Sequence, residues 1–280
     1  MDVWCAAVGF GSHHDGSDRS MMTFVYFAEL FSWAEMPWSG VLDGDVMRLI
    51  QGREKLQRPV DCPNEVYESV MLKCWRLDLR TRAEADEIVS SFEAACSSFD
   101  VRELQWPASS NVQRVDLRNS GANDASTQAF DEMKAIEVPR TCVQMKQVLG
   151  SGEFGEVVLG ILTINTKVSN VAVKMLKSGS GPEAAEKFKL EAQLLAGLHH
   201  PHIVEVKAVC FQSTPNFIAL ELMPGGDLQS FLVKHSAELK ASATVQMDLL
   251  NALVQIGEAM AYLERKKVVH RDLAARFVFV

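Results

Sequence analysis

The chain has 280 residues, of which 48% are hydrophobic, and a formal net charge of −8 that comes from 36 acidic and 28 basic side chains. This length and apolar content suffice for one large or two small globular domains with a real core. The acidic balance provides no basic footprint for nucleic acid or for an anionic membrane surface, so we expect neither as a partner.

The cysteines and the apolar runs bear on the compartment. Six cysteines are scattered without Cys-x-x-Cys spacing, and several lie inside apolar runs. Buried free thiols of this kind are typical of a reducing, cytoplasmic environment. No apolar stretch reaches the roughly 18 residues that a spanning helix requires, and residues 1–16 lack the pattern of a signal peptide. We therefore expect no membrane span in this chain.

The first part of the chain is predicted to be helical. Apolar residues recur at helical spacing over residues 44–51 and 66–74, with Arg58-Pro59 and Cys62-Pro63 marking turns between them. Residues 97–136 follow, where Ser, Asn, Gly and Asp cluster without sustained periodicity. That composition is typical of a flexible linker.

Residues 137–280 show a different pattern, in which β-branched runs alternate with helical stretches. Pro182 suits the first turn of a helix over residues 182–198. A second, longer amphipathic helix is predicted over residues 244–267. The runs that predict strands lie at 143–149, 156–162, 170–175, 203–210 and 216–222. The fold class is therefore α+β.

A glycine-rich turn lies between the first two predicted strands. Gly150, Gly152 and Gly155 form a Gly-x-Gly-x-x-Gly motif, in which the missing side chains let the backbone approach phosphate oxygens closely. The motif alone is weak evidence, because dinucleotide-binding folds contain it and because a glycine hairpin without a ligand is commoner than either. Here a strand and not a helix follows it, which disfavours dinucleotide binding.

A lysine and a glutamate strengthen the case for a phosphate site. Lys174 follows Val171-Ala172-Val173 in the third predicted strand, and Glu191 lies on the predicted helix. Taken singly, each is typical of a solvent-exposed surface. Their joint spacing predicts an ion pair that holds the ammonium near the α- and β-phosphates of a nucleotide.

Residues 137–276 resemble the N-terminal lobe and the beginning of the catalytic loop of a protein tyrosine kinase. The resemblance rests on the motifs above, on His270-Arg271-Asp272-Leu273-Ala274-Ala275-Arg276 and on residues 217–232, which are most similar to receptor tyrosine kinases of the anaplastic-lymphoma-kinase and insulin-receptor type. It implies ATP as cofactor with Mg²⁺, and transfer of the γ-phosphate to a tyrosine of a substrate protein. It also implies a cytoplasmic protein or the intracellular part of a larger receptor.

The resemblance also implies roles for individual residues. Asp272 would be the catalytic base, Lys174 and Glu191 would clamp the phosphates, and Arg276 fits the tyrosine-specific form of the loop. Leu220 would be the gatekeeper residue at the adenine pocket. The full set of nucleotide-binding residues that it implies is Leu149, Gly150, Ser151, Gly152, Glu153, Phe154, Gly155, Glu156, Val157, Ala172, Lys174, Leu220, Glu221 and Met223.

The chain departs from the family pattern at its metal ligands. Phe277 stands where the family has a magnesium-binding Asn, and no Asp-Phe-Gly follows before Val280. A phenyl ring cannot coordinate magnesium, so we expect slow phosphorylation or none. No Cys or carboxylate stands at metal-ligand spacing from the histidines at 199, 200 and 202, and we therefore expect no protein metal site.

The first part of the chain resembles the last third of the same family's C-terminal lobe. The segments that carry the likeness are residues 29–40, 46–52 and 62–67 and Cys74-Trp75, and Asp2-Val3-Trp4 resembles the opening of that lobe's central helix. We therefore expect three parts: a partial helical C-lobe at 1–96, a flexible linker at 97–136, and at 137–280 a five-stranded N-lobe with a regulatory helix, a hinge and the beginning of the catalytic loop.

Several readings stay open at this point. The chain is either the end of one kinase-like domain joined to the beginning of another, or a permuted body in which residues 1–99 pack against residues 137–280. In function it is either a tyrosine kinase or a non-catalytic pseudokinase that serves as a scaffold and binds ATP or a partner kinase. A truncated or misassembled product without a stable fold is the remaining alternative.

Overall fold

The computed structural model describes most of the chain, which divides into two compact units. One unit comprises Met1–Val115 with Gly225–Val280, and the other comprises Asp116–Pro224. The described residues are 4–5, 26–35, 38, 40–41, 45, 48–49, 54–76, 81, 83–98, 130–151, 155–177, 179–240, 243–268, 270 and 273–280.

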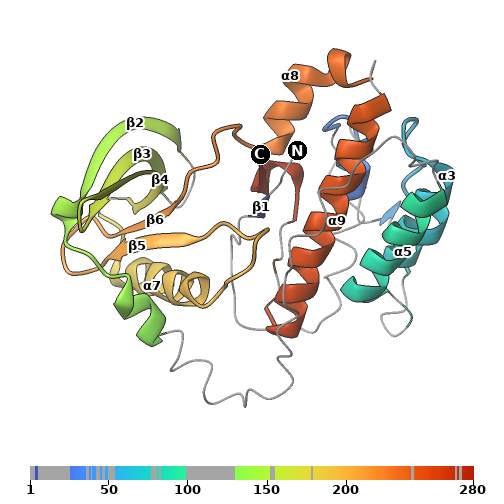
Figure 1. The fold of residues 1–280 in the computed structure, drawn as a ribbon. Helices are drawn as coiled ribbons and strands as arrows, with labels where there is room; N and C mark the ends of the chain where they lie inside the picture. Colours follow the sequence, from blue (N-terminus) through green and yellow to red (C-terminus); the bar gives the residue numbers. More distant parts are fainter. Residues whose placement is uncertain are drawn as a thin grey trace. The chain divides into compact units, whose positions relative to one another are not determined.

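The unit Asp116–Pro224 contains an antiparallel five-stranded sheet and one long helix (Figure 1). The strands are β2 (Val143–Ser151), β3 (Gly155–Ile164), β4 (Lys167–Leu176), β5 (Val206–Cys210) and β6 (Phe217–Glu221), and helix α7 (Pro182–Ala196) lies between β4 and β5 in the chain. Their order in the sheet is β2-β3-β4-β6-β5. The α+β fold with five strands and one inserted helix, expected from the sequence, is confirmed.

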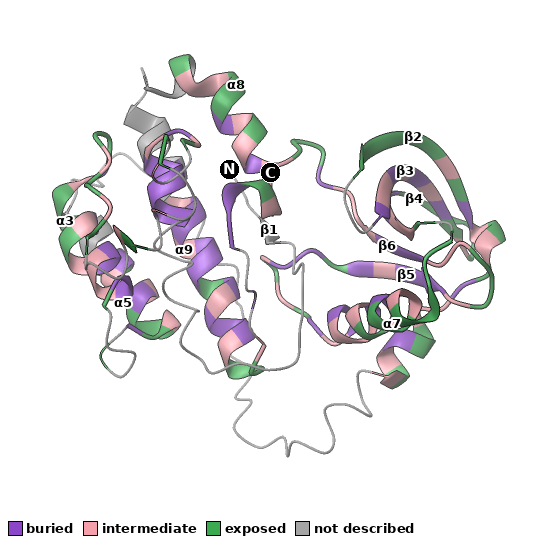
Figure 2. Ribbon diagram, turned by 180° about the vertical axis from the view of Figure 1, so that it is seen from behind, coloured by how far each residue is buried: buried purple, intermediate pink, exposed green. Residues whose placement is uncertain are grey.

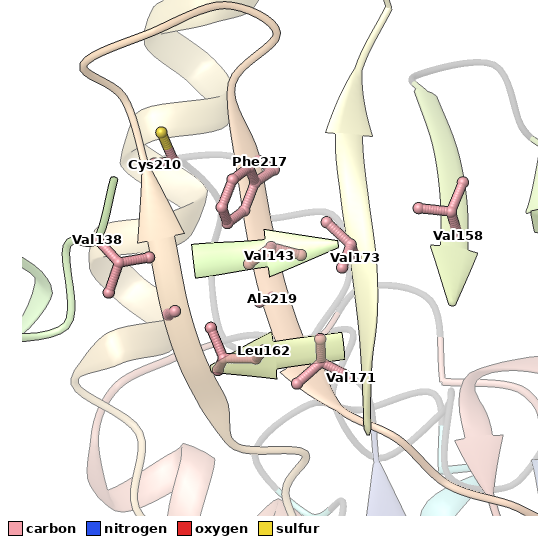
Figure 3. Packing of buried hydrophobic residues seen from close by; sticks show 10 residues of the cluster. Val138, Val143, Val158, Leu162, Val171, Val173, Cys210, Phe217 and Ala219 are labelled. Atoms are coloured by element: carbon pink, nitrogen blue, oxygen red, sulfur yellow. The ribbon is translucent and has the colours of Figure 1, made fainter. Parts of the chain in front are cut away.

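A hydrophobic cluster of buried residues lies on one face of the sheet of this unit. In β4, and over much of β3, its buried members alternate with less buried residues, because successive side chains of a strand point to opposite faces. Figure 3 shows Val143, Leu162, Val171, Val173 and Phe217 gathered in this cluster. Val171, Val173 and Phe217 are fully buried. The opposite face of the same strands carries a different set of residues, Lys174 among them.

Residues 130–135, within the expected linker, are helical. Met133 in this helix is buried. The Ile136 carbonyl then accepts a hydrogen bond from the Val209 amide at 3.1 Å, and the Val138 amide donates to the Val209 carbonyl at 2.9 Å. The chain therefore pairs with β5 from Ile136. Residues 97–98 of the expected linker are the last residues of helix α5 (Ala85–Ser98), and residues 99–129 lie outside the described residues.

The unit formed by Met1–Val115 and Gly225–Val280 joins helices from the beginning of the chain to helices from its end. From the beginning come the helical residues 26–31, α3 (Asn64–Val66), the π-helix η1 (Tyr67–Met71), α4 (Leu72–Cys74) and α5 (Ala85–Ser98). From the end come α8 (Leu228–Lys240), α9 (Ala243–Arg265) and the short 3-10 helix η3 (Ala275–Phe277). From Leu249 onward, α9 carries buried residues, among them Leu253 and Ile256, and Figure 2 shows this buried stretch of the helix. Residues from the beginning of the chain thus supply part of the cover for α9.

Helix α5 packs directly on α9 (Figure 1). The Ala85 amide at the first turn of α5 donates to the Glu264 carboxylate at 3.1 Å, so a side chain of α9 satisfies one of the free amides of that turn. An exposed ion pair of 3.2 Å joins Arg265 and Asp86 beside it. Farther along, a Cβ at Gly257 would lie 2.8 Å from a Val89 methyl carbon, which shows how closely the helices approach.

A small antiparallel sheet also joins the two ends of the chain. Strand β1 (Trp4–Cys5) pairs with β7 (Val278–Phe279), and Phe279 bridges on its other side to Asp227. The expectation that Asp2-Val3-Trp4 opens a helix is wrong at Trp4, which is extended. In that position the backbone of β1 bonds across to β7 and covers an edge of that strand.

These contacts bear on the two arrangements left open above. Segments from both ends of the chain lie in one compact unit, as the permuted arrangement requires. The division at residues 96 and 136 stays a prediction. Among the described residues, no helix has the length and hydropathy needed to cross a membrane.

The close approach of α5 and α9 yields a first prediction. Gly257→Ala should be coupled to Val89→Ala by about 1 kcal/mol, since the new methyl group meets a valine methyl group only when Val89 is present. In the Val89→Ala background, the same change should stabilise α9, because alanine exceeds glycine in helix propensity by about 1 kcal/mol. Chemical unfolding of the single and double variants measures this coupling. Additive effects would show that the two helices do not meet at Gly257.

Candidate functional site

The face of the sheet opposite the valine core gathers several of the predicted nucleotide-binding residues. Lys174 is paired with Val157 on the neighbouring strand β3, and Ala172 is paired with Leu220 on β6. Cross-strand partners share a face, and residues two apart on one strand share it too. Val157, Ala172, Lys174 and Leu220 therefore lie on one face, and all four are half-buried.

An ion pair stands on this face. Nζ of Lys174 on β4 lies 2.6 Å from Oε1 of Glu191 on α7, with 19% of the lysine side chain and 17% of the glutamate side chain exposed. The same Nζ lies 5.8 Å from the centre of the Phe188 ring. Limited exposure keeps water from screening the pair fully, so a cation is held at a defined place on the sheet. The structure brings together the lysine and glutamate whose spacing suggested a pair.

The glycines that flank the predicted phosphate loop differ in their surroundings. A Cβ at Gly155 would lie 2.1 Å from the Met175 carbonyl oxygen, so the backbones of β3 and β4 approach more closely than a side chain permits. A Cβ at Gly150 would meet nothing within 4 Å. Gly155 thus has a structural need for glycine, whereas Gly150 has none. Gly152, Glu153 and Phe154 lie outside the described residues.

The other predicted nucleotide-binding residues flank this face. Leu149 is 47% exposed, and Ser151 and Glu156 form the last cross-strand pair of β2 and β3 before the turn. Glu221 ends β6, and its amide donates to the Glu205 carbonyl at 2.9 Å. Met223 follows in the predicted hinge and is buried. These positions are described, while their binding roles stay predictions.

The predicted catalytic segment belongs to the other unit. His270 is buried, and Asp272 lies outside the described residues. Arg276 is exposed in η3, with the central guanidinium carbon Cζ 4.9 Å from the centre of the Phe277 ring. The aromatic ring thus packs against the arginine and presents no oxygen that a metal ion could use.

The contact of one buried acidic residue, Glu29, with the predicted catalytic segment was not anticipated from the sequence. Oε2 of Glu29 accepts a hydrogen bond of 2.8 Å from the Ala275 amide, and Glu29 is 3% exposed. The two residues are 246 positions apart. No local pattern could have indicated this contact, although a glutamate inside the apolar run from Tyr26 to Phe31 is an unusual occupant.

The described residues offer no evident metal site. Within them, no group of three or more His, Cys, Asp or Glu side chains is arranged to hold a metal ion. Cys62 is a buried free thiol, and burial raises its pKa to about 12 despite the opposing charge of Arg58. A thiol with that pKa stays protonated at neutral pH and is a poor metal ligand.

Comparison with known proteins gives consistent matches to kinases. The family model described as "Protein tyrosine and serine/threonine kinase" matches residues 17–92 and 143–280. The chain is 39% identical over 143 residues to the transforming protein ros of UR2 avian sarcoma virus, a match that covers 49% of this chain and 36% of that protein. It is 41% identical over 143 residues to the human proto-oncogene tyrosine-protein kinase ROS, covering 49% of this chain and 6% of ROS.

A different tyrosine-protein kinase, Fer, matches this chain with similar identity. The chain is 43% identical over 134 residues to the rat tyrosine-protein kinase Fer, covering 48% of this chain and 15% of Fer. In each of these three matches the chain covers at most 36% of the relative's length. The activities of those whole proteins therefore come to this chain only as proposals.

The surroundings of the two described loop glycines predict different tolerances. Gly155→Ala should lower the free energy of unfolding by about 1–3 kcal/mol, because the strands must separate to admit the methyl group. Gly150→Ala is the matched control and should change it by less than about 0.5 kcal/mol. Thermal unfolding compares the two. Equal effects would contradict the close approach at Gly155.

The buried thiol predicts a pH dependence of stability. The folded-state pKa of Cys62, about 12, exceeds the unfolded value of roughly 8.5, so its contribution is fully present below that lower value and is lost as pH rises toward 12. Between about pH 9 and 10.5 the wild type should lose up to about 1.4 kcal/mol per pH unit more than Cys62→Ala. Urea unfolding across this range measures the difference. Parallel profiles would show that the thiol is not buried.

Proposed function

The chain belongs to the protein tyrosine and serine/threonine kinase family, and we propose that it binds ATP on the sheet face that carries Lys174. Kinases of this family generally use ATP with Mg²⁺. In the proposal, the Lys174 ammonium contacts the α- and β-phosphates, Glu191 holds it in place, and Val157, Ala172 and Leu220 provide apolar contact for the adenine ring. The described glycines of the motif, Gly150 and Gly155, lie near the phosphates in this proposal.

The single observation that carries this proposal is the 2.6 Å contact between Lys174 and Glu191. A lysine on a strand would ordinarily extend into water, but here a carboxylate from α7 holds its ammonium beside an apolar surface. Such a cation is suited to an anionic ligand with an apolar end, because the phosphates receive a fixed charge and the base receives a desolvated surface. ATP has both features.

The residues present fit ATP better than they fit its metal. Phe277 replaces the expected magnesium-binding Asn, and its ring packs against the Arg276 guanidinium. When bound, Mg²⁺ neutralises charge on the β- and γ-phosphates in this family, but the phenyl side chain provides no ligand for it. The proposed binding of ATP therefore does not depend on the metal. Transfer to a protein tyrosine, with Asp272 as base, is proposed to be slow.

The same observation favours a second function. A non-catalytic pseudokinase that binds ATP and engages a partner kinase needs Lys174 and Glu191 but not the metal ligand, and Phe277 agrees with that requirement. In either case we propose a reducing compartment, the cytoplasm or the cytoplasmic side of a receptor. Cys62 and Cys210, which are buried and form no disulfide, support it.

Calorimetry of ATP binding tests the proposal. Lys174→Met should weaken binding roughly 10- to 100-fold, the factor expected for losing a charged hydrogen bond. Glu191→Gln should weaken it less, because the ammonium remains. The matched control is Lys187→Met, which removes an exposed lysine from α7, the helix that carries Glu191, and should leave the affinity for ATP unchanged. A wild-type protein that does not bind ATP, or equal effects of the two lysine variants, would contradict the proposed site.

Magnesium dependence separates the two functions. Because Phe277 offers no metal ligand, the affinity for ATP should change by less than about threefold when Mg²⁺ is removed, and restoring the ligand with Phe277→Asn should increase this dependence. Binding that already requires magnesium in the wild type would favour the enzyme over the pseudokinase.

A further inference from the structure

The carboxylate of Glu29 is placed to control the backbone of the predicted catalytic loop. Its Oε2 accepts a 2.8 Å hydrogen bond from the Ala275 amide, in a buried setting. A carboxylate loses much of its hydration when it is buried, so the donors around it must compensate for that loss. A charged acceptor also forms a stronger hydrogen bond to an amide than a neutral acceptor does.

The carboxylate itself is held in a fixed position. Glu29 lies on the helix formed by residues 26–31, whose Phe27 and Leu30 side chains are fully buried. The Phe27 ring meets Phe92 of α5 edge-on, with 5.0 Å between the ring centres. Because this helix is fixed by its core contacts, its carboxylate has a fixed position relative to the loop.

The amide that it holds occupies a sensitive place in the chain. Ala275 begins η3, follows the buried residues Leu273 and Ala274, and precedes Arg276. It comes three residues after Asp272 in the sequence. Immediately after η3, the chain enters β7, which pairs with β1. Two segments from the beginning of the chain therefore contact this loop and the strand that follows it.

We propose that Glu29 is a positioning residue for residues 273–277, so that a side chain from the beginning of the chain fixes the loop that carries Arg276 and follows Asp272. The loop's part in phosphoryl transfer rests on the proposed function, whereas its positioning by Glu29 does not.

Amide hydrogen exchange, measured by NMR on the full chain without nucleotide, tests this proposal. Glu29→Ala should speed exchange of the Ala275 amide roughly 10- to 100-fold, because the acceptor is lost. Glu29→Gln keeps an uncharged acceptor of the same shape and should restore part of the protection. The matched control is Glu65→Gln, which removes an exposed carboxylate from the same unit and should leave Ala275 unchanged.

Exchange at the buried Leu253 in α9 separates positioning from a general loss of stability. Local opening accelerates Ala275 alone, whereas global destabilisation accelerates both amides together. A selective rise in the ratio of the Ala275 rate to the Leu253 rate supports the proposal, and an unchanged ratio overturns it. If Glu29→Ala does not fold, the ratio in Glu29→Gln decides. Failure of the wild type to bind ATP would reject the proposed function without altering this result.

Discussion

The register of strand β4 against its two neighbours is the constraint on which the rest of the candidate site depends. Val173 pairs with Val158 and Ala219 toward the core, and Lys174 pairs with Val157 and Ile218 on the opposite face. A slip of one residue would exchange these faces, burying the ammonium among valines and exposing the core. The cost of either change fixes the register, and the register in turn places Lys174 where Glu191 can reach it.

The unit formed by Met1–Val115 and Gly225–Val280 depends on contacts between distant parts of the chain. Helix α9 carries a long apolar face, and α5 covers part of it at Gly257. The Glu264 carboxylate accepts from the first turn of α5, β1 pairs with β7, and Glu29 holds Ala275. Each contact joins the beginning of the chain to its end. An account that treats the two ends as separate domains would leave these surfaces uncovered.

Local signals in the sequence were sufficient for the sheet and the ion pair. The β-branched runs and the glycine turn predicted β2 to β6, because alternation and turn chemistry act over a few residues. The spacing of Lys174 and Glu191 predicted a contact that the fold provides at 2.6 Å. The glycine motif did not reveal that Gly155 is needed for strand packing, since that depends on the Met175 backbone across the strand pair.

Non-local contacts were beyond the reach of the sequence. The pairing of β1 with β7 and the bond between Glu29 and Ala275 join residues with no periodic relation to each other. Trp4 was expected to open a helix because its neighbours resemble a helical motif, yet tertiary pairing made it extended. The sequence was sufficient to show that Phe277 replaces the expected metal ligand, but the packing of its ring against Arg276 could be found only in the structure.

The most direct test of the account asks which face of the sheet receives the nucleotide. Methyl NMR with a non-hydrolysable ATP analogue observes Val157 and Ala172 on the Lys174 face and Val171 and Val173 in the core. The account predicts that the signals of Val157 and Ala172 shift on titration, while those of Val171 and Val173 change little. Equal shifts on both faces, or none on the Lys174 face, would contradict it.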